Sequence, residues 1–223
     1  MWGKKRPVFA VYIEEPDFAE EAGSIFCGDM TVKDYMHLAM AKKDGARGYA
    51  AATTGLVEEA RLRHNTSPTA TVALGRALTA AVLMSGLLKV GQRVALKWEG
   101  TGPLRKIVVE ADAKGRVRGY VGESEIDLPL LQGEYDVPGA IGAAGLLTVV
   151  RDLRLPDLAT GVVHLVDSDI THDLTFFLEQ SDQVPSAVEI GVTLNEDGSV
   201  AFAGGILIQP LPPYDPVIIE RLK

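Results

Sequence analysis

Apolar residues are densest over residues 67–88, where the sequence reads SPTATVALGRALTAAVLMSGLL. Pro68 suits the first position of a helix, because its missing N–H would be unpaired there, and the Ser67 hydroxyl can cap the amides that follow. Apolar side chains would point nearly all round this helix, and its uncharged part, residues 77–88, is shorter than the roughly 20 residues that cross a membrane. The pattern therefore predicts a helix buried in a protein core.

Alternating apolar and polar residues predict antiparallel strands before and after this helix. In the strand that follows it, Val94, Leu96 and Trp98 alternate with charged or small residues, so one face of that strand should pack on the core. Turn compositions such as Asp-Gly separate neighbouring strands and predict tight hairpins. The predicted strands are residues 34–42, 46–53, 93–99, 104–111, 116–121, 146–153, 162–166, 187–195 and 200–209.

Two shorter helices are predicted over residues 55–64 and 170–181. Thr54 should cap the first, with Glu58 and Glu59 in its first turn, where carboxylates favour the positive end of the helix dipole. Runs of neighbouring strands with interspersed helices predict an α+β fold, with mostly antiparallel sheets packed around the central buried helix. We expect an extension of unknown role over residues 1–29, one compact domain over 30–210, and the start of a further helix over 211–223.

Composition narrows the classes of function. Among 223 residues, 22 Lys and Arg face 30 Asp and Glu, and the absence of a basic stripe argues against a nucleic-acid partner. The first residues do not form a secretory signal, and no stretch is long enough to cross a membrane, so no membrane partner is expected. The single cysteine, Cys27, can form neither an internal disulfide nor a structural zinc site alone, which favours a reducing, cytoplasmic location.

A glycine-rich loop, GAIGAAG, is one stretch that could bind a phosphate group. A dinucleotide fingerprint places its glycines after a strand and at the start of a helix, whereas Gly139, Gly142 and Gly145 precede a predicted strand. Turn glycines are therefore the favoured interpretation. The sequence contains no G-x-S-x-G, P-loop or H-E-x-x-H motif, and no catalytic residue is assigned.

A second stretch contains His164, Asp167, Asp169 and His172, which could be imagined as metal ligands. They fall on two different predicted elements and include no pair of histidines one helical turn apart, so capping of a solvated helix start by Asp169 and its neighbours Ser168 and Asp173 is favoured. A small-molecule or metal-dependent enzyme that uses the glycine-rich loop 139–145 or this histidine region is the alternative hypothesis.

Six stretches, in this order along the chain, resemble the amino-terminal domain of the Hsp33 family, the redox-regulated holdase chaperones. They are TTGLVEEARLRH at 53–64, SPTATVALGRALTAAVLMSGLLK at 67–89, GTGPLRKIVVEADAKGRVRGYVG at 100–122, GLLTVVRDL at 145–153, FFLEQSDQVPSAV at 176–188 and AGGILIQPLP at 203–212. The resemblance runs from Lys33 to Lys223. None of the stretches is a catalytic signature; their order makes the resemblance specific.

The resemblance implies a domain organisation. Hsp33 proteins have a folded client-binding domain, a helical linker and a carboxy-terminal domain in which four cysteines hold zinc until oxidation releases it. Residues 30–210 would then be the client-binding domain and residues 211–223 the start of the linker. The four cysteines do not occur in this sequence, and Cys27 lies outside the match. No zinc switch or other cofactor is therefore expected in this chain, which is either a fragment or a form without the sensor.

The resemblance also implies a function: ATP-independent holding of unfolded proteins, not enzymatic catalysis. An apolar sheet surface left open would bind unfolded clients irrespective of redox state, and it would favour a homodimer. The candidate client-binding residues lie in the meander predicted over 93–121, and they are Ile107, Val108, Val109 and Tyr120. Alternation alone does not say which face of that sheet is free.

Overall fold

The structure is a computed structural model that describes residues 34–41 and 45–212. Its strands are β1 (Tyr35–Ala41), β2 (Ala46–Ala52), β3 (Arg93–Gly100), β4 (Lys106–Asp112), β5 (Val117–Val121), β6 (Gly145–Asp152), β7 (Ala159–His164), β8 (Ala187–Leu194) and β9 (Val200–Pro210). Its helices are α1 (Thr54–His64), α2 (Pro68–Ser85), α3 (Val137–Ile141) and α4 (Ile170–Gln180).

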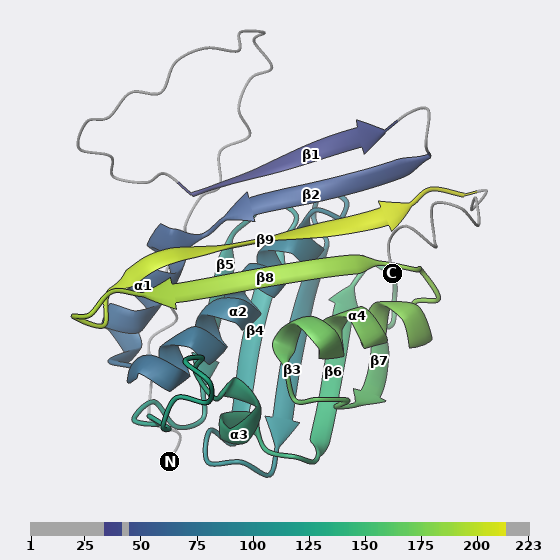
Figure 1. Cartoon of the computed structure of the whole chain (residues 1–223). Coiled ribbons are helices and arrows are strands. Elements are labelled where there is room, and N and C mark those ends of the chain that lie inside the picture. Colours follow the sequence, from purple (N-terminus) through teal and green to yellow (C-terminus); the bar gives the residue numbers. More distant parts are fainter. Residues whose placement is uncertain (1–33, 42–44, 213–223) are drawn as a thin grey trace, which may run out of the picture.

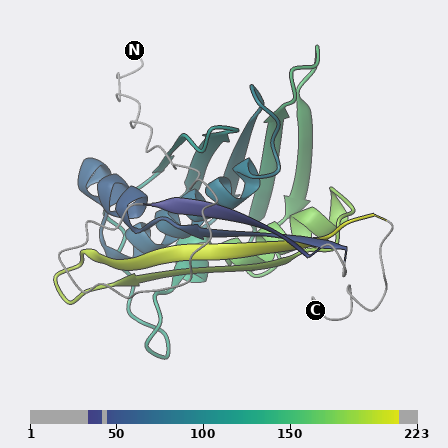
Figure 2. The same ribbon diagram turned by 90° about the horizontal axis from the view of Figure 1, so that it is seen from above.

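The strands form two antiparallel sheets that cross each other (Figure 1). One sheet has four strands in the order β1-β2-β9-β8, and the other has five in the order β5-β4-β3-β6-β7. The helices lie on one side of the four-stranded sheet, as the view from above shows (Figure 2). The predicted α+β fold with antiparallel sheets is confirmed.

Helix α2 is the central element. It packs against β2, β8 and β9 on one side and against β3, β4 and β5 on the other, and all its residues except Pro68 and Arg76 are buried. Two details of the prediction are wrong. The helix ends at Ser85, not at residue 88, and the Ser67 hydroxyl makes no capping hydrogen bond. The amide of Ala70, which such a cap would bind, donates instead to the Ile126 carbonyl at 3.1 Å.

Glycines in and after α2 allow neighbouring elements to approach closely. A Cβ atom on Gly75 would lie 2.6 Å from Cγ1 of Val57 in α1, and one on Gly86 would lie 2.5 Å from Cδ1 of Tyr49 in β2. Contacts this short do not occur, so a side chain at either position would push the neighbouring element away. Small residues in this region therefore set the distance between α2 and its neighbours.

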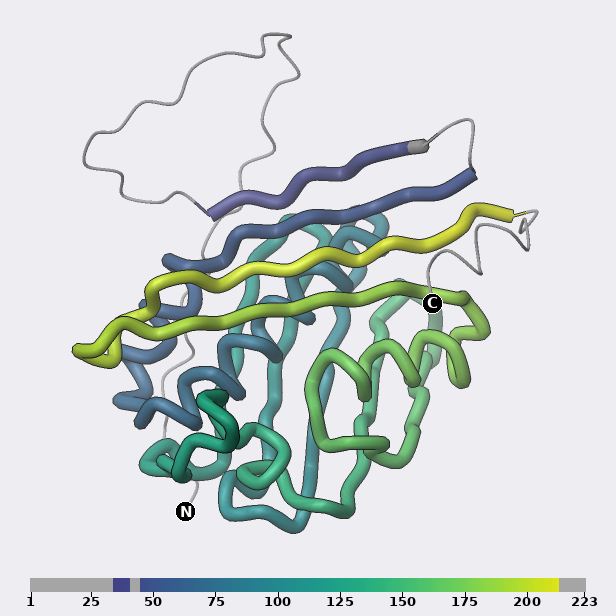
Figure 3. The backbone as a smooth tube through the Cα atoms, in the orientation of Figure 1, coloured from purple at the N-terminus to yellow at the C-terminus, as the bar shows by residue number. Residues whose placement is uncertain are grey.

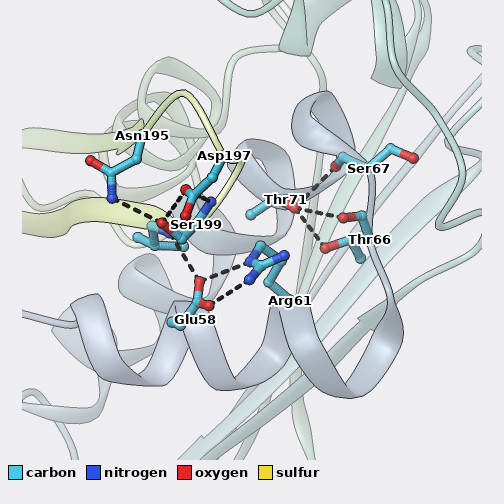
Figure 4. A network of polar contacts seen from close by, with 9 residues as sticks. Glu58, Arg61, Thr66, Ser67, Thr71, Asn195, Asp197 and Ser199 are labelled. Carbon is cyan, nitrogen blue, oxygen red and sulfur yellow. Dashed lines mark hydrogen bonds and ion pairs between the residues drawn. The ribbon is translucent and has the colours of Figure 1, made fainter.

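Helix α1 begins at Thr54, one residue earlier than predicted, so Glu58 and Glu59 lie beyond its first turn. Glu58 instead accepts a hydrogen bond from Arg61 Nε at 2.8 Å and another from the Val200 amide at 2.9 Å (Figure 4). The contact to Val200 ties α1 to the start of β9. Arg61 holds the pKa of Glu58 below its ordinary value.

Other departures from the predicted elements concern short segments. Helix α3 was not expected, because five residues are too few to show a helical period. Strand β7 covers residues 159–164 instead of 162–166. The expected extension and Cys27 lie outside the described residues, and so does the expected helix over 211–223 except for Leu211 and Pro212, which are not helical. No helix in the described ranges is long and apolar enough to span a membrane.

Candidate functional site: the outer faces of the two sheets

The side of the four-stranded sheet that points away from α2 has almost no charge. On the opposite side, Tyr49, Val188, Val192 and Leu207 are buried in the core. The pairing register places the residues of the outward side next to one another, and we call this set the apolar face. It consists of Tyr35, His37, Ala39, Gly48, Ala50, Ala52, Ala187, Glu189, Gly191, Thr193, Phe202, Gly204, Ile206 and Ile208. Of these described residues, Glu189 alone carries a formal charge at pH 7.

Small residues make up much of the apolar face, and only a few large side chains project from it. Tyr35, Phe202 and Ile206 are 43%, 52% and 40% exposed. The Phe202 ring lies over Gly204, where an added Cβ would be 2.9 Å from Cζ of the ring. Because alanine and glycine fill much of the space between these side chains, another polypeptide could lie close to the sheet.

The outer side of the five-stranded sheet is charged over β3, β4 and β5, while Leu146 and Val162 on β6 and β7 are exposed there without a charge. It carries Arg93, Lys97, Glu99, Lys106, Glu110, Asp112, Arg118 and Asp152 at the alternating positions that face away from α2. Glu110 pairs with Arg118 at 2.5 Å and with Arg93 at 3.6 Å, and Lys97 pairs with Glu99 at 2.6 Å. An unfolded apolar segment would have to displace water from these charges, which is costly.

The four candidate residues from the sequence divide between the two sides of this five-stranded sheet. Ile107 and Val109 are fully buried under α2. Val108 is half-buried and Tyr120 is 40% exposed on the charged side, where the two are paired across β4 and β5 and Lys106 Nζ lies 5.8 Å from the centre of the Tyr120 ring. Lysine and glutamate at alternate positions of β4 were the signal that this side meets water.

The glycine-rich loop serves close packing of the backbone. Its first part forms α3, capped by Asp136, whose Oδ1 accepts from the Gly139 amide at 2.7 Å. Gly142 has φ +97°, and a side chain there would overlap the backbone of Gly102. Gly142 is therefore a turn glycine as expected, whereas Gly139 lies inside α3 and Gly145 begins β6.

The histidine region is divided between β7 and the start of α4. His164 is exposed on β7, and His172 Nδ1 lies 3.0 Å from Asp167 Oδ2. Asp169 caps α4 by accepting from the Thr171 amide at 2.9 Å, and it also pairs with Arg76 at 2.8 Å. Within residues 34–41 and 45–212, no three His, Cys, Asp or Glu side chains form a group that could hold a metal ion.

Asp173 departs from the expected solvated helix start. Its side chain is fully buried, and Oδ1 accepts from the Val166 amide at 2.8 Å while Oδ2 has no hydrogen-bond partner. Burial raises the pKa of Asp173 to about 6, and the charges of Asp169 and Asp167 add to this shift. Ser168 is buried too, and its hydroxyl donates to the Gly142 carbonyl at 2.5 Å.

A family model described as "Hsp33 protein" matches residues 34–223 of this chain. The chain belongs to the Hsp33 family. Among Hsp33 relatives, the 33 kDa chaperonin of Geobacter sulfurreducens is 52% identical over 194 residues, which cover 87% of this chain and 64% of that protein. The 33 kDa chaperonin of Aquifex aeolicus is 50% identical over 86% of this chain and 60% of its own.

The crystal structure of an Hsp33 protein, the 33 kDa chaperonin of Thermotoga maritima, matches with a TM-score of 0.75 and 40% identity over 79% of this chain and 60% of that chain. This chain thus spans less than two thirds of the length of these relatives. The Hsp33 family and the relatives are named as chaperonins and not as enzymes, and none of the comparisons supports the alternative of a small-molecule or metal-dependent enzyme.

The residues given do not fit the four-cysteine zinc site that the Hsp33 resemblance implies. The sequence contains one cysteine, Cys27. The described part of the chain contains no cluster of His, Cys, Asp or Glu side chains that could hold a metal ion. A zinc-dependent step is therefore not assigned to these residues.

Proposed function

We propose that this chain is the client-binding part of an ATP-independent holdase, which binds unfolded proteins through the apolar face and keeps them from aggregating in the cytoplasm. One observation carries the proposal. Of the two sheet surfaces that point away from α2, the apolar face carries one formal charge among its described residues, whereas the outer side of the five-stranded sheet carries a row of ion pairs. Membership of the Hsp33 family and the name chaperonin of the relatives support it.

The physical basis of binding is burial of apolar surface. At about 25 cal/mol per Å², a client segment that covers roughly 300 Å² of the apolar face would gain about 7 kcal/mol before the cost of ordering it. The free energy of burying apolar surface does not depend on the direction of a contact, so many different client sequences can bind. Release would depend on the client's own folding or on another chaperone.

We further propose that client binding by this chain is independent of redox state, since the four cysteines of the family's sensor are not among its 223 residues. Aggregation of a heat-denatured client, followed by light scattering with and without reductant, tests both proposals. We expect suppression in both conditions. No suppression in either would refute the holdase proposal, and suppression only after oxidation would refute redox independence.

A matched pair of variants tests the position of the site. Ile206 on the apolar face and Tyr120 on the charged side are both 40% exposed, so a lysine at either position is accommodated similarly. We expect Ile206→Lys to raise the amount of protein needed for suppression several-fold and Tyr120→Lys to leave it unchanged. The opposite result would move the site to the side of the five-stranded sheet that carries Val108 and Tyr120.

A homodimer is part of the proposal. A second copy that covers the apolar face would bury the same kind of surface as a client does, and isologous dimers are the commonest soluble assemblies. Molar mass by light scattering during size-exclusion chromatography should give a dimer that weakens in Ile206→Lys. A monomer at all concentrations would contradict this part and leave the holdase proposal untouched.

A further inference from the structure

Strand β1 forms an edge of the four-stranded sheet (Figure 3), and among the described residues this edge has none of the usual protections. Its seven residues, YMHLAMA, include no proline, glycine or charged side chain, and they pair with β2 without a bulge. Every second residue of an edge strand directs its N–H and C=O away from the sheet. Among the described residues, no backbone hydrogen bond other than those to β2 reaches β1.

The other edges, β8, β5 and β7, are each modified or covered. Strand β8 has a register shift between Thr193 and Leu194 and packs against α4. Strand β5 is five residues long and carries Arg118 in an ion pair. Strand β7 packs against α4, with Gly161 so close to Phe177 that an added Cβ would lie 2.8 Å from its Cε2. Bulges, charges and covering helices all hinder the addition of a further strand.

Apart from Met36, which packs partly against the core, the described side chains of both rows on β1 are exposed, and none is charged. Leu38 and Met40, in the row on the same side as α2, are 49% and 52% exposed. Tyr35, in the row that belongs to the apolar face, is 43% exposed. A strand added beside β1 would therefore find apolar neighbours on both of its faces, and on one face it would continue the apolar face of the sheet.

We propose that an unfolded client adds an extended segment to β1 as a further strand of this sheet. The inference rests on the holdase proposal and deepens it, because it adds main-chain hydrogen bonds to the burial of side chains. The occupant is an uncharged stretch of about six residues, rich in β-branched and aromatic side chains. A charge in that stretch would lie beside Leu38 or Met40 and lose part of its water.

This mode of binding fits the breadth of client recognition that a holdase needs. All unfolded chains share the same backbone, so hydrogen bonds along an edge do not depend on the client's sequence. The apolar side chains of β1 then exclude charged client segments but do not require one particular sequence motif. The uncharged edge and the uncharged apolar face next to it favour the same class of segment.

Amide hydrogen exchange of the full chain, alone and with heat-denatured client, tests the inference directly. We expect exchange within residues 35–41 to slow about tenfold in the client complex, since the outward amides gain partners. A second test uses Leu38→Lys, which places a charge at the edge as natural edge strands do. Its matched control is Leu62→Lys, where the leucine is 63% exposed and lies on helix α1, outside the four-stranded sheet.

Leu38→Lys should raise the amount of protein needed for suppression several-fold, and Leu62→Lys should not. Suppression by the wild-type chain without slower exchange in β1 would overturn strand addition while the holdase proposal stands. Absence of suppression by the wild-type chain would overturn both. Slow exchange of β1 in the free protein would overturn the proposed occupant: loss of this protection on dilution would identify a second copy, and its persistence would identify another part of the same chain.

Discussion

The carboxylate of Asp34 caps helix α1, because its Oδ2 accepts the amide of Leu56 at 2.6 Å and its Oδ1 accepts that of Gly55 at 2.8 Å. Thr53, at the N-cap position, makes no side-chain cap. The cap therefore comes from a residue far away in the sequence that immediately precedes the edge strand β1. Burial raises the pKa of Asp34, and the two amide hydrogen bonds oppose that rise.

We expect Asp34→Ala to lower the free energy of unfolding by about 1 to 2 kcal/mol, as loss of a helix cap does. It should also speed amide exchange at the start of β1, because the cap anchors that strand to α1. Thermal and urea unfolding measure the first effect, and Asp157→Ala, an exposed aspartate in the loop after β6, is the control. Equal stability of the two variants would contradict the capping role.

Gly75 sets the distance between α1 and α2. Alanine has the higher helix propensity by about 1 kcal/mol, yet its Cβ would lie 2.6 Å from Val57 Cγ1, and the stiff valine has little freedom to move. We expect Gly75→Ala to destabilise the fold by about 1 to 3 kcal/mol in urea unfolding. Combining it with Val57→Ala should cost less than the sum of the single changes, and strict additivity would argue against the contact.

Arg151 and Asp182 form a two-pronged ion pair between β6 and the segment after α4, with N–O distances of 2.9 and 2.5 Å. Their side chains are 19% and 21% exposed. A double-mutant cycle with alanine should give a coupling energy of about 1 kcal/mol. The same cycle on Arg154 and Asp152, 3.8 Å apart with the arginine 60% exposed, should give a value near zero. Similar values for both pairs would contradict this difference.

Asp173 should make the stability of the domain depend on pH. Its pKa is raised from 3.8 to about 6 in the folded state, so the folded state binds the proton more tightly than the unfolded state does. The stability that this group contributes is full below pH 4 and is lost as the pH rises through about 6. At pH 7 the buried carboxylate then costs up to about 3 kcal/mol.

The Asp173→Asn variant tests this expectation. It should be more stable than the wild type at pH 7, and the difference should shrink as the pH falls toward 4. Urea unfolding between pH 4 and 7.5 measures it, with Asp157→Asn as the exposed control. A stability difference that does not change with pH would show that Asp173 acts through packing and not through its charge.

Local patterns of residues predicted much of this fold. The alternation of Val94, Leu96 and Trp98 identified the buried side of β3, and all three are buried against the core. Short elements escaped prediction, since α3 is shorter than the period by which helices are recognised. The cap of α1 also escaped prediction, because Asp34 precedes the two amides that it binds by 21 and 22 residues in the sequence.

Which side of each sheet is buried is the clearest case of a feature beyond sequence patterns. Ile107 and Val109 alternate with Val108 in a way that separates two faces of β4, and both faces contain apolar residues. Only packing against α2 shows that the face with Ile107 and Val109 is inside. The charges beside Val108 and Tyr120 then distinguish the second sheet's outer side from the apolar face.

By itself, the sequence determined that α2 is a buried helix and that antiparallel strands surround it, because apolar periodicity is a local property of the chain. Tertiary structure decided which side of each sheet is buried against α2 and which strands lie at the sheet edges. Both depend on contacts between segments far apart in the sequence: α2 covers one side of each sheet, and β9 pairs with β2 and thereby places β1 at an edge. Alternation can separate the two faces of a strand, but long-range packing decides which of them meets water.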